Sequence, residues 1–343
     1  MEEHLVELDS LKFLPFNYKR LPNYNPSSAN IFGMSFGLFM IAAPMMGWID
    51  YNSPTLGSIL CFGGICEYII GFFNWYDGRG IQSFIDFVFG LLHLTIYYTT
   101  ELGKYSIPIP YEYYTDHKIR KYGAHGTSHY YVSQRTIEYL GHPEHSNVIV
   151  CHLGAGASLC AVKDGKSYNT SMGLTPLAGV MMSTRCGDID ASVIDYLDEN
   201  LHMSIKDITN MLNKKSGLLG VSGVSGDMRD VKAAADESNE RAKLAIDIFI
   251  RRVADYIGKY FVQLGKVDAI SFTAGIGENA PWVRKLILEA VGQALGIVID
   301  DDANENGKGE RLISAPESKV KVYVIPTNEE LVIARDAKKI LNL

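Results

Sequence analysis

The polar residues best suited to chemistry are a histidine and an arginine that accompany three glycine-rich turns. The turns read GAHGTSH at residues 123–129, LGAGAS at 153–158 and AGIGEN at 274–279. Small residues allow backbone N–H groups to converge on an oxyanion, as they do in phosphate-binding loops. His125 lies in the first turn, and Arg185 lies in the segment TRCGDID.

These residue types suit phosphoryl transfer. The transferred group spreads negative charge over three oxygens, so catalysis depends on positioning and on donors that stabilise this charge. An imidazole N–H and a guanidinium are such donors, and the arginine fork binds a carboxylate or phosphate through two hydrogen bonds. The alternatives are a structural role for His125 and a surface salt bridge from Arg185 to Asp188 or Asp190.

The elements that must position these residues follow from hydrophobic periodicity. Residues 148–151 and 159–162 are predicted to be buried strands joined by the second glycine turn, and Asp164-Gly165 predicts a hairpin to a third strand. A helix is expected from Tyr130. An apolar stripe at helical spacing predicts a core helix within 237–264: Ala242, Ala245, Ile246, Phe249, Ile250, Val253, Tyr256 and Ile257.

The third glycine turn is predicted to join the strand 269–272 to a helix that begins near Pro281. Exposed N–H groups and a helix dipole at such a junction favour phosphate. In the closing segment TNEE, Thr327 is expected to cap a helix and Glu330 to reach back to it, which leaves Glu329 free. Asp227 in SGDMRD either caps the segment that follows or binds a ribose hydroxyl, and both roles are compatible.

Residues 107–343 resemble the acetate kinase family through YGAHGTSHYYV, LGAGAS, TRCGDID, SGDMRD and AGIGEN. The resemblance implies an α/β lobe of the ASKHA class (actin-like ATPase, ribonuclease-H-like) that transfers phosphate from ATP to acetate with Mg2+. It assigns catalysis to His125 and Arg185 and the metal to Glu329. The nucleotide contacts that it implies are His152, Leu153, Gly154, Ala155, Gly156, Asp227, Met228, Arg229, Gly275, Ile276, Gly277, Glu278 and Asn279.

The chain also departs from the family pattern. Ala155 stands where the family usually has asparagine, which weakens the expected grip on phosphate, and Cys186 replaces a serine. No position matches the early asparagine, lysine, arginine and aspartate that the family's first lobe contributes. Because losing one positioned partner lowers a rate by about 10² to 10³, we expect weak nucleotide binding and poor turnover. Acetate and propionate remain alternatives.

The first hundred residues have a different character. After a polar segment at 1–28, residues 29–49 carry no charge, which is long enough to cross a bilayer, and 56–75 and 81–100 are nearly as apolar. About three transmembrane helices are therefore predicted within 29–100, with buried helices of a soluble domain as the alternative. Ionisable Glu67, Asp86 and His93 would then line a path or bond neighbouring helices.

Residues 22–100 resemble the beginning of the acetate uptake transporter family at Asn25, Pro26, Gly33, Phe62, Gly63 and Gly64. Three interpretations follow: a phosphotransferase with a membrane anchor, a fusion that couples uptake to activation, or the product of two joined gene fragments without activity. A kinase lobe that uses ATP would lie on the cytoplasmic side of the membrane.

Bulk properties limit the partners. The net charge of −7 argues against nucleic acid, and small molecules are the expected partners. Five cysteines without CxxC spacing indicate reduced thiols rather than a disulfide or zinc framework. The resemblance also makes a homodimer an expectation.

Overall fold

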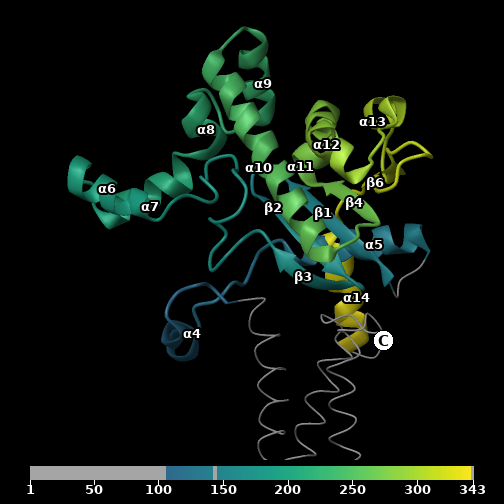
Figure 1. The fold of residues 1–343 in the computed structure, drawn as a ribbon, viewed down its shortest axis with the longest axis horizontal. Coiled ribbons are helices and arrows are strands. Elements are labelled where there is room, and N and C mark those ends of the chain that lie inside the picture. The colour runs from purple at the N-terminus through teal and green to yellow at the C-terminus, as the bar shows by residue number, and fades with distance from the viewer. Residues whose placement is uncertain (1–105, 142–144, 341–343) are drawn as a thin grey trace, which may run out of the picture. The chain divides into compact units, whose positions relative to one another are not determined.

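The computed structural model describes residues 106–141 and 145–340 (Figure 1). The segments predicted to cross a membrane, and the features resembling a transporter, lie outside these ranges. Within them, no helix combines the length and the apolar character needed to span a bilayer.

A mixed sheet of six strands organises the described part of the chain. The strands are β1 (Asn147–Leu153), β2 (Ala157–Lys163), β3 (Lys166–Thr170), β4 (Ala269–Thr273), β5 (Arg311–Leu312) and β6 (Lys321–Val324). Their order in space is β3-β2-β1-β4-β6-β5. The pairs β1–β4 and β4–β6 are parallel and the other neighbours are antiparallel, so the sheet places the first predicted strand beside one that lies far along the chain.

The helices of the described residues are α4 (Tyr111–His117), α5 (Gly126–Leu140), α6 (Ser192–Leu201), α7 (Ile205–Lys214), α8 (Gly217–Ser222), α9 (Met228–Asp236), α10 (Glu240–Leu264), α11 (Ala274–Asn279), α12 (Pro281–Leu295), α13 (Asp301–Asn306) and α14 (Glu329–Ile340). α10 packs on one face of the sheet and α5 on the other, whereas α4, α6 and α7 lie away from it (Figure 1).

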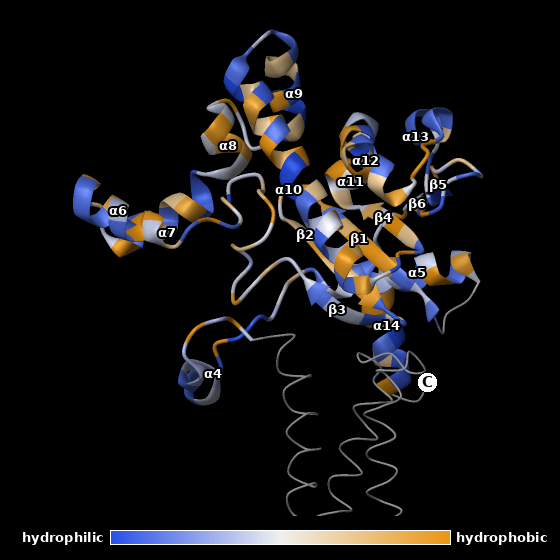
Figure 2. Ribbon diagram, in the orientation of Figure 1, coloured by the Kyte–Doolittle hydropathy of each residue, from blue (hydrophilic) through white to orange (hydrophobic). Residues whose placement is uncertain are grey.

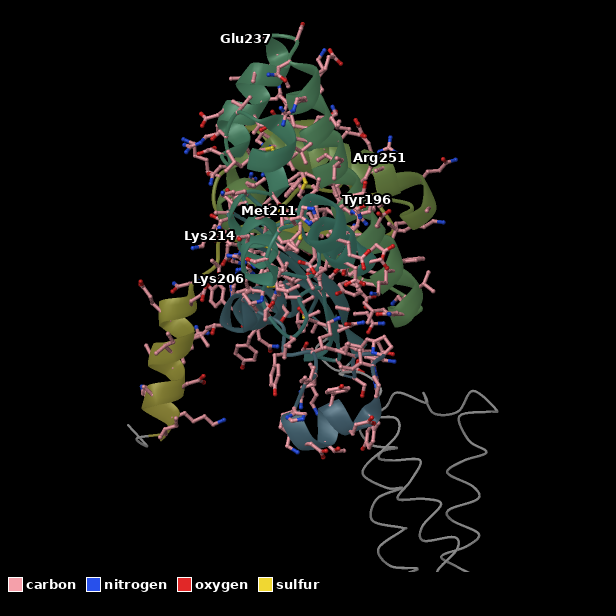
Figure 3. All side chains as sticks on the ribbon, turned by 90° about the vertical axis from the view of Figure 1, so that its left-hand side faces the viewer. Tyr196, Lys206, Met211, Lys214, Glu237 and Arg251 are labelled. Carbon is pink, nitrogen blue, oxygen red and sulfur yellow. The ribbon has the colours of Figure 1, made fainter. Side chains whose placement is uncertain are left out.

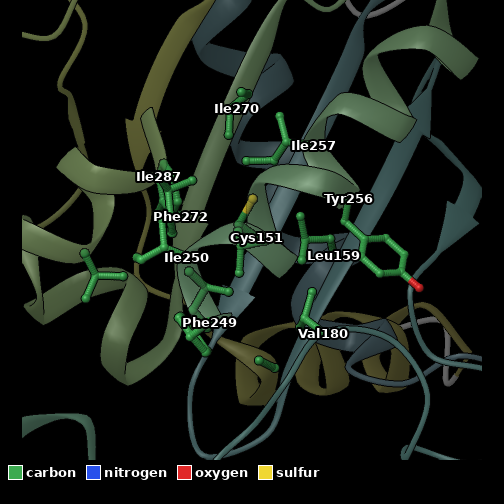
Figure 4. Close-up of a cluster of buried hydrophobic side chains, with 14 of the residues drawn as sticks. Cys151, Leu159, Val180, Phe249, Ile250, Tyr256, Ile257, Ile270, Phe272 and Ile287 are labelled. Carbon is green, nitrogen blue, oxygen red and sulfur yellow. The ribbon is translucent and has the colours of Figure 1, made fainter. Parts of the chain in front are cut away.

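Alternate residues of β1 enter two different cores. Ile149 and Cys151 join a cluster with residues of α10 and α12, whereas Val148 and Val150 join a second cluster with residues of α5 and α14. This alternation is the two-residue period of a strand, and it explains why the central strands are apolar almost throughout. Figure 4 shows the first cluster around Cys151.

The long helix α10 confirms the predicted apolar stripe. Phe249, Val253 and Ile257 are fully buried, and Ile246 is the one member of the stripe that stays partly exposed. Burying a side chain of this size contributes about 1.5–3 kcal/mol. Figure 2 shows hydrophobic colour on the central strands β1 and β4 and hydrophilic colour on the edge strand β3.

The turns between the first three strands also match the prediction. β1 and β2 pair from Asn147–Lys163 to Leu153–Ala157, so residues 154–156 form a tight connection. Asp164 and Gly165 both have positive φ, 50° and 73°, as a two-residue hairpin turn of the Asp-Gly type requires. β3 lies at one edge of the sheet, which agrees with its more exposed side chains.

Candidate functional site

His125 stands directly before α5, with a left-handed backbone (φ 62°) that is unusual for a residue other than glycine. The helix begins at Gly126, four residues earlier than predicted, because the N–H of His129 already bonds to the carbonyl of His125 at 2.8 Å. Strained backbone of this kind persists only where the surroundings hold it, and it is common at functional sites.

Three histidine rings, His125, His129 and His152, form a compact group that we call the histidine cluster. The rings of His125 and His152 are stacked with centroids 3.9 Å apart. Two buried serines orient the rings. Ser158 Oγ lies 2.8 Å from His125 Nδ1 and 2.7 Å from His129 Nε2, and Ser128 Oγ lies 2.8 Å from His152 Nδ1. Only His125 is substantially accessible.

Burial keeps the cluster uncharged near neutral pH. It lowers the pKa of His152 to about 3 and the pKa of His129 well below its ordinary value, with further lowering by the neighbouring rings. Burial also lowers the pKa of His125, while the charge of Glu329 raises it and that of Arg185 lowers it. His125 is therefore a neutral imidazole with one cationic and one anionic neighbour.

The turn between β1 and β2 is the meeting point of the site. A Cβ built on Gly156 would lie 3.3 Å from His125 Nε2 and 3.6 Å from Arg185 Nη2. A Cβ on Gly154 would lie 4.0 Å from the backbone nitrogen of Gly275. The structure thus brings the turns at 154–156 and 274–279 together, with His125 and Arg185 beside the first of them.

Arg185 is held by its own loop. Its Nη1 donates to the carbonyl of Pro176 at 2.9 Å, and within the described residues it forms no ion pair, so the predicted alternative of a salt bridge to an aspartate is wrong. Asp188 instead accepts from the N–H of Gly179 at 2.8 Å and from the hydroxyl of Tyr256.

The same loop connects the second glycine turn to Asp227. The N–H of Ser183 donates to the carbonyl of Ala155 at 3.1 Å, and a Cβ on Gly226 would lie 2.3 Å from Ser183 Oγ. Asp227 caps α9 by accepting from the N–H of Arg229 at 2.9 Å, which confirms the capping role. Hydrogen bonds from Arg229 lower the pKa of Asp227 to about 2.

The segment AGIGEN differs from the predicted open turn, because residues 274–279 form the short helix α11. Its first N–H, at Ala274, is already bonded to Glu278 Oε1 at 2.8 Å, so Glu278 faces its own helix. Gly275 remains exposed, with open space where a side chain would stand, and Asn279 Nδ2 donates to its carbonyl at 2.9 Å. The most exposed residues of this segment are therefore Gly275 and Asn279.

A fully buried arginine supports α11 from behind. Arg284 donates through Nη1 to the carbonyls of Gly277 and Glu278, each at 2.9 Å, and through Nε and Nη2 to Asn304 at 2.8 and 2.6 Å. Burial lowers its pKa to about 10, so it stays charged near neutral pH. α11 has only six residues, and hydrogen bonds from the side chains of Arg284 and Glu278 hold it in place.

The start of α14 corrects another prediction. Asn328, not Thr327, caps the helix, because Asn328 Oδ1 accepts from the N–H of Leu331 at 3.0 Å. Thr327 Oγ1 is buried and has no hydrogen-bond partner among the described residues. Glu329 is exposed in the first turn and lies near enough to His125 to raise its pKa.

Not every predicted contact presents its side chain to this site. Leu153 and Met228 belong to the hydrophobic core, so only their backbone is available to a ligand. His152 is buried and stacks on His125, and Gly277 is the buried residue of α11. Ala155 and Ile276 keep partial or full exposure, and Arg229 is exposed but paired with Asp227.

Three residues of the site were missed in the sequence: Ser128, Ser158 and Arg284. Ser128 lies in the glycine turn 123–129 and Ser158 in the glycine turn 153–158. Their position in the same turns as the predicted site residues was the only indication of a role. A basic residue in the first turn of a helix is usually solvated, so nothing in the sequence distinguished Arg284.

The model of the acetokinase family matches residues 86–335, and the chain belongs to this family. Acetate kinase of Pseudothermotoga lettingae is 52% identical over 235 residues, which cover 68% of this chain and 58% of that protein. The matched family span begins inside the segment 81–100 that the apolar pattern assigned to a membrane helix.

Solved structures agree with this relationship. Acetate kinase from Porphyromonas gingivalis has a TM-score of 0.68 at 37% identity, covering 84% of this chain and 73% of that one. Propionate kinase from Francisella tularensis has a TM-score of 0.63 at 49% identity, covering 67% and 59%. The predicted α/β fold of the ASKHA class is thereby supported for the kinase-like part. The chain spans about 60% of the length of the curated relatives.

Proposed function

We propose that this chain carries an acetate kinase-type site, in which a phosphoryl group passes from ATP to the carboxylate oxygen of a short acid, giving ADP and an acyl phosphate. The convergence of His125 Nε2 and Arg185 Nη2 on the Gly156 turn carries this proposal. Two donors that meet beside a backbone turn suit a transferring group whose three oxygens share negative charge. The substrate is acetate or propionate, in keeping with the two kinds of relative.

ATP would lie across the two adjoining turns. Gly154, Gly156 and Gly275 leave room for phosphates close to the backbone, and Asn279 offers an exposed amide beside them. Asp227 would accept a hydrogen bond from a ribose hydroxyl. For this, the hydroxyl must replace the Arg229 side chain as the donor to the Asp227 carboxylate. Ala155 supplies no side-chain donor, so phosphate contact at that point is limited to the backbone.

A magnesium ion fits the residues present. Mg2+ is commonly held by one or two carboxylates together with phosphates and water, and Glu329 is an exposed carboxylate whose charge reaches His125. Within 106–141 and 145–340 no cluster of three or more metal-binding side chains occurs, so the phosphates would complete the shell. When bound, the ion would neutralise charge on the phosphates, while His125 and Arg185 act on the transferring group.

Turnover by this chain is proposed to be weak. About 40% of the acetate kinases of Pseudothermotoga lettingae and Helicobacter hepaticus lies outside the match, and the resemblance places several substrate-side groups in that part. Nucleotide binding and phosphoryl transfer must therefore be measured separately.

The decisive experiment combines both measurements on the full chain. Acyl phosphate is trapped with hydroxylamine in the presence of ATP, Mg2+ and acetate or propionate, and nucleotide affinity is measured by calorimetry. We expect His125→Ala and Arg185→Ala each to lower the rate by about 10²-fold with a small change in ATP affinity. His117→Ala and Arg251→Ala are matched surface controls, and Figure 3 labels Arg251. Equal rates for the wild type and both site variants would overturn the proposal.

A homodimer through α6 and α7 is proposed in addition. α6 has no buried residue, and Val193, Tyr196 and Leu201 expose apolar surface on it, with Tyr196 62% exposed. Exposed apolar residues gathered on one element are typical of an interface. Light scattering of the wild type and Tyr196→Asp tests this, with a dimer that becomes a monomer as the expected result and an unchanged mass as the contrary one.

Membrane association through residues 29–100 is also a proposal, supported by the apolar sequence alone. Fractionation of cells that express the full chain tests it, with recovery in the membrane pellet expected. A transcript that is continuous across residues 95–112 would favour one natural protein over two joined gene fragments.

A further inference from the structure

Ser158 occupies the centre of the histidine cluster, and its hydroxyl raises a question of proton placement. Its Oγ lies 2.8 Å from His125 Nδ1, 2.7 Å from His129 Nε2 and 3.4 Å from the carbonyl of Ala124. A hydroxyl has one hydrogen to donate. At least one of the two ring nitrogens must therefore donate to Ser158, and the position of each histidine proton is constrained by the other.

The surroundings of His129 show which of its two ring nitrogens carries the proton. Its ring is buried and neutral, so it carries a single proton on either Nδ1 or Nε2. Nδ1 is buried and has no hydrogen-bond partner among the described residues. An orphaned N–H in the interior is rarer than an orphaned acceptor. The proton of His129 therefore sits on Nε2, which donates to Ser158 Oγ.

The position of the proton on His125 follows from that on His129. Ser158 already accepts from His129, and its own hydrogen can go to His125 Nδ1 at 2.8 Å or to the carbonyl of Ala124 at 3.4 Å. The shorter contact has hydrogen-bond geometry typical of a hydroxyl donor, whereas the longer one is marginal. With Nδ1 as the acceptor, His125 carries its proton on Nε2, the nitrogen that faces Gly156 and Arg185.

We propose that His129 and Ser158 are positioning residues that lock His125 in the Nε2–H tautomer, so that the ring presents a hydrogen-bond donor to the transferring phosphoryl group. The statement about the phosphoryl group rests on the proposed function, whereas the tautomer itself does not. No proton is transferred along this chain of bonds. A carboxylate nucleophile needs no base to activate it, and a lone pair at Nε2 would repel the phosphoryl oxygens, so a fixed donor is the useful form.

The test is histidine-selective 15N labelling of the full chain, because two-bond 1H–15N correlations distinguish the Nε2–H and Nδ1–H tautomers. Signals of His125 are assigned by their loss in His125→Gln. We expect the Nε2–H pattern in the wild type and an averaged pattern in Ser158→Ala, which removes the donor to Nδ1. An Nδ1–H pattern in the wild type, or an unchanged pattern in Ser158→Ala, would overturn the proposal.

A pair of substitutions at His129 separates positioning from packing. His129→Gln keeps an N–H near the Nε2 position and is expected to preserve the His125 pattern, whereas His129→Leu fills the space without a donor and is expected to lose it. Where turnover is measurable, Ser158→Ala should lower kcat about tenfold and leave the KM for ATP unchanged. The wild-type spectrum remains decisive if a variant fails to fold, and it is informative even if the chain transfers no phosphate.

Discussion

The two sides of the candidate site are built differently. On one side, the histidine cluster is fixed by hydrogen bonds between side chains, with Ser128 and Ser158 orienting the rings. On the other side, α11 exposes Gly275 to solvent and is held from behind by Arg284. The contrast indicates that donors aimed at a reacting group need an oriented side chain, whereas a nucleotide seat needs an accessible and immobile backbone.

The largest effect is expected when the buried side chain that supports α11 is removed. Arg284→Met leaves the carbonyls of Gly277, Glu278 and Asn304 without their buried donor, which we expect to destabilise the fold by about 3–5 kcal/mol. Urea unfolding measures the loss. Lys285→Met on the same helix, where the lysine pairs with Asp301 at the surface, is the control and should leave the stability nearly unchanged.

The loop of Arg185 offers the next test. Gly187 has φ 74°, and a Cβ there would lie 2.5 Å from the carbonyl of Gly179, so Gly187→Ala is expected to cost about 2–3 kcal/mol and to displace Arg185. Gly258→Ala, in the interior of α10 with open space at its Cβ, should instead stabilise by about 0.5–1 kcal/mol. A loss of stability no larger in Gly187→Ala than in its control would contradict this account.

The stability of the fold should depend on pH through the histidine cluster. Histidine in the unfolded chain has a pKa of about 6.5, and burial lowers the pKa of folded His152 to about 3. The unfolded chain binds more protons between these values, so stability is fully present above about pH 6.5 and declines below it, by about 1 kcal/mol for this ring at pH 5.5. Unfolding curves at several pH values should show a weaker decline in His152→Gln than in the surface control His117→Gln.

The smallest expected effect concerns which residue, Asn328 or Thr327, caps α14. Asn328→Ala removes the cap and should destabilise by about 1 kcal/mol. Thr327→Val replaces a buried hydroxyl that has no partner among the described residues, and it should be neutral or stabilising. Thermal unfolding of the two variants compares them directly, and the reverse order would restore Thr327 as the cap.

Much of the fold was predictable because it depends on local patterns. The apolar runs of β1, β2 and β4, the stripe of α10 and the Asp-Gly hairpin all carry their periodicity in a short stretch of sequence. The site was predictable as a set of turns, since glycine and the residues beside it indicate where backbone is exposed. The expectation that the turns at Gly154, Asp227 and Gly275 surround one cleft, with His125 and Arg185 at its mouth, agrees with the direct contacts of Gly154 and with the contacts through Ser183 that reach Gly226.

The rest depended on tertiary contacts. Whether AGIGEN would be a turn or a helix was decided by Glu278 bonding back to Ala274 and by Arg284 from a later helix. Thr327 and Asn328 are both good capping residues, and only the folded structure shows that Asn328 accepts from the N–H of Leu331. The tautomer of His125 depends on its contact with Ser158 of β2, a residue 33 positions later in the chain, and no local pattern reveals this relationship.

The parallel pairing of β1 with β4 has a consequence for biosynthesis. Val148 pairs with Ala269, so the ribosome must make all of α6 to α10 before the second glycine turn can meet Gly275. Contacts between residues so far apart in sequence form slowly, because a long loop must close first. A nascent chain would therefore expose β1 and β2 without their neighbour for a time, and a ligand that binds both turns would favour the completed fold over that aggregation-prone intermediate.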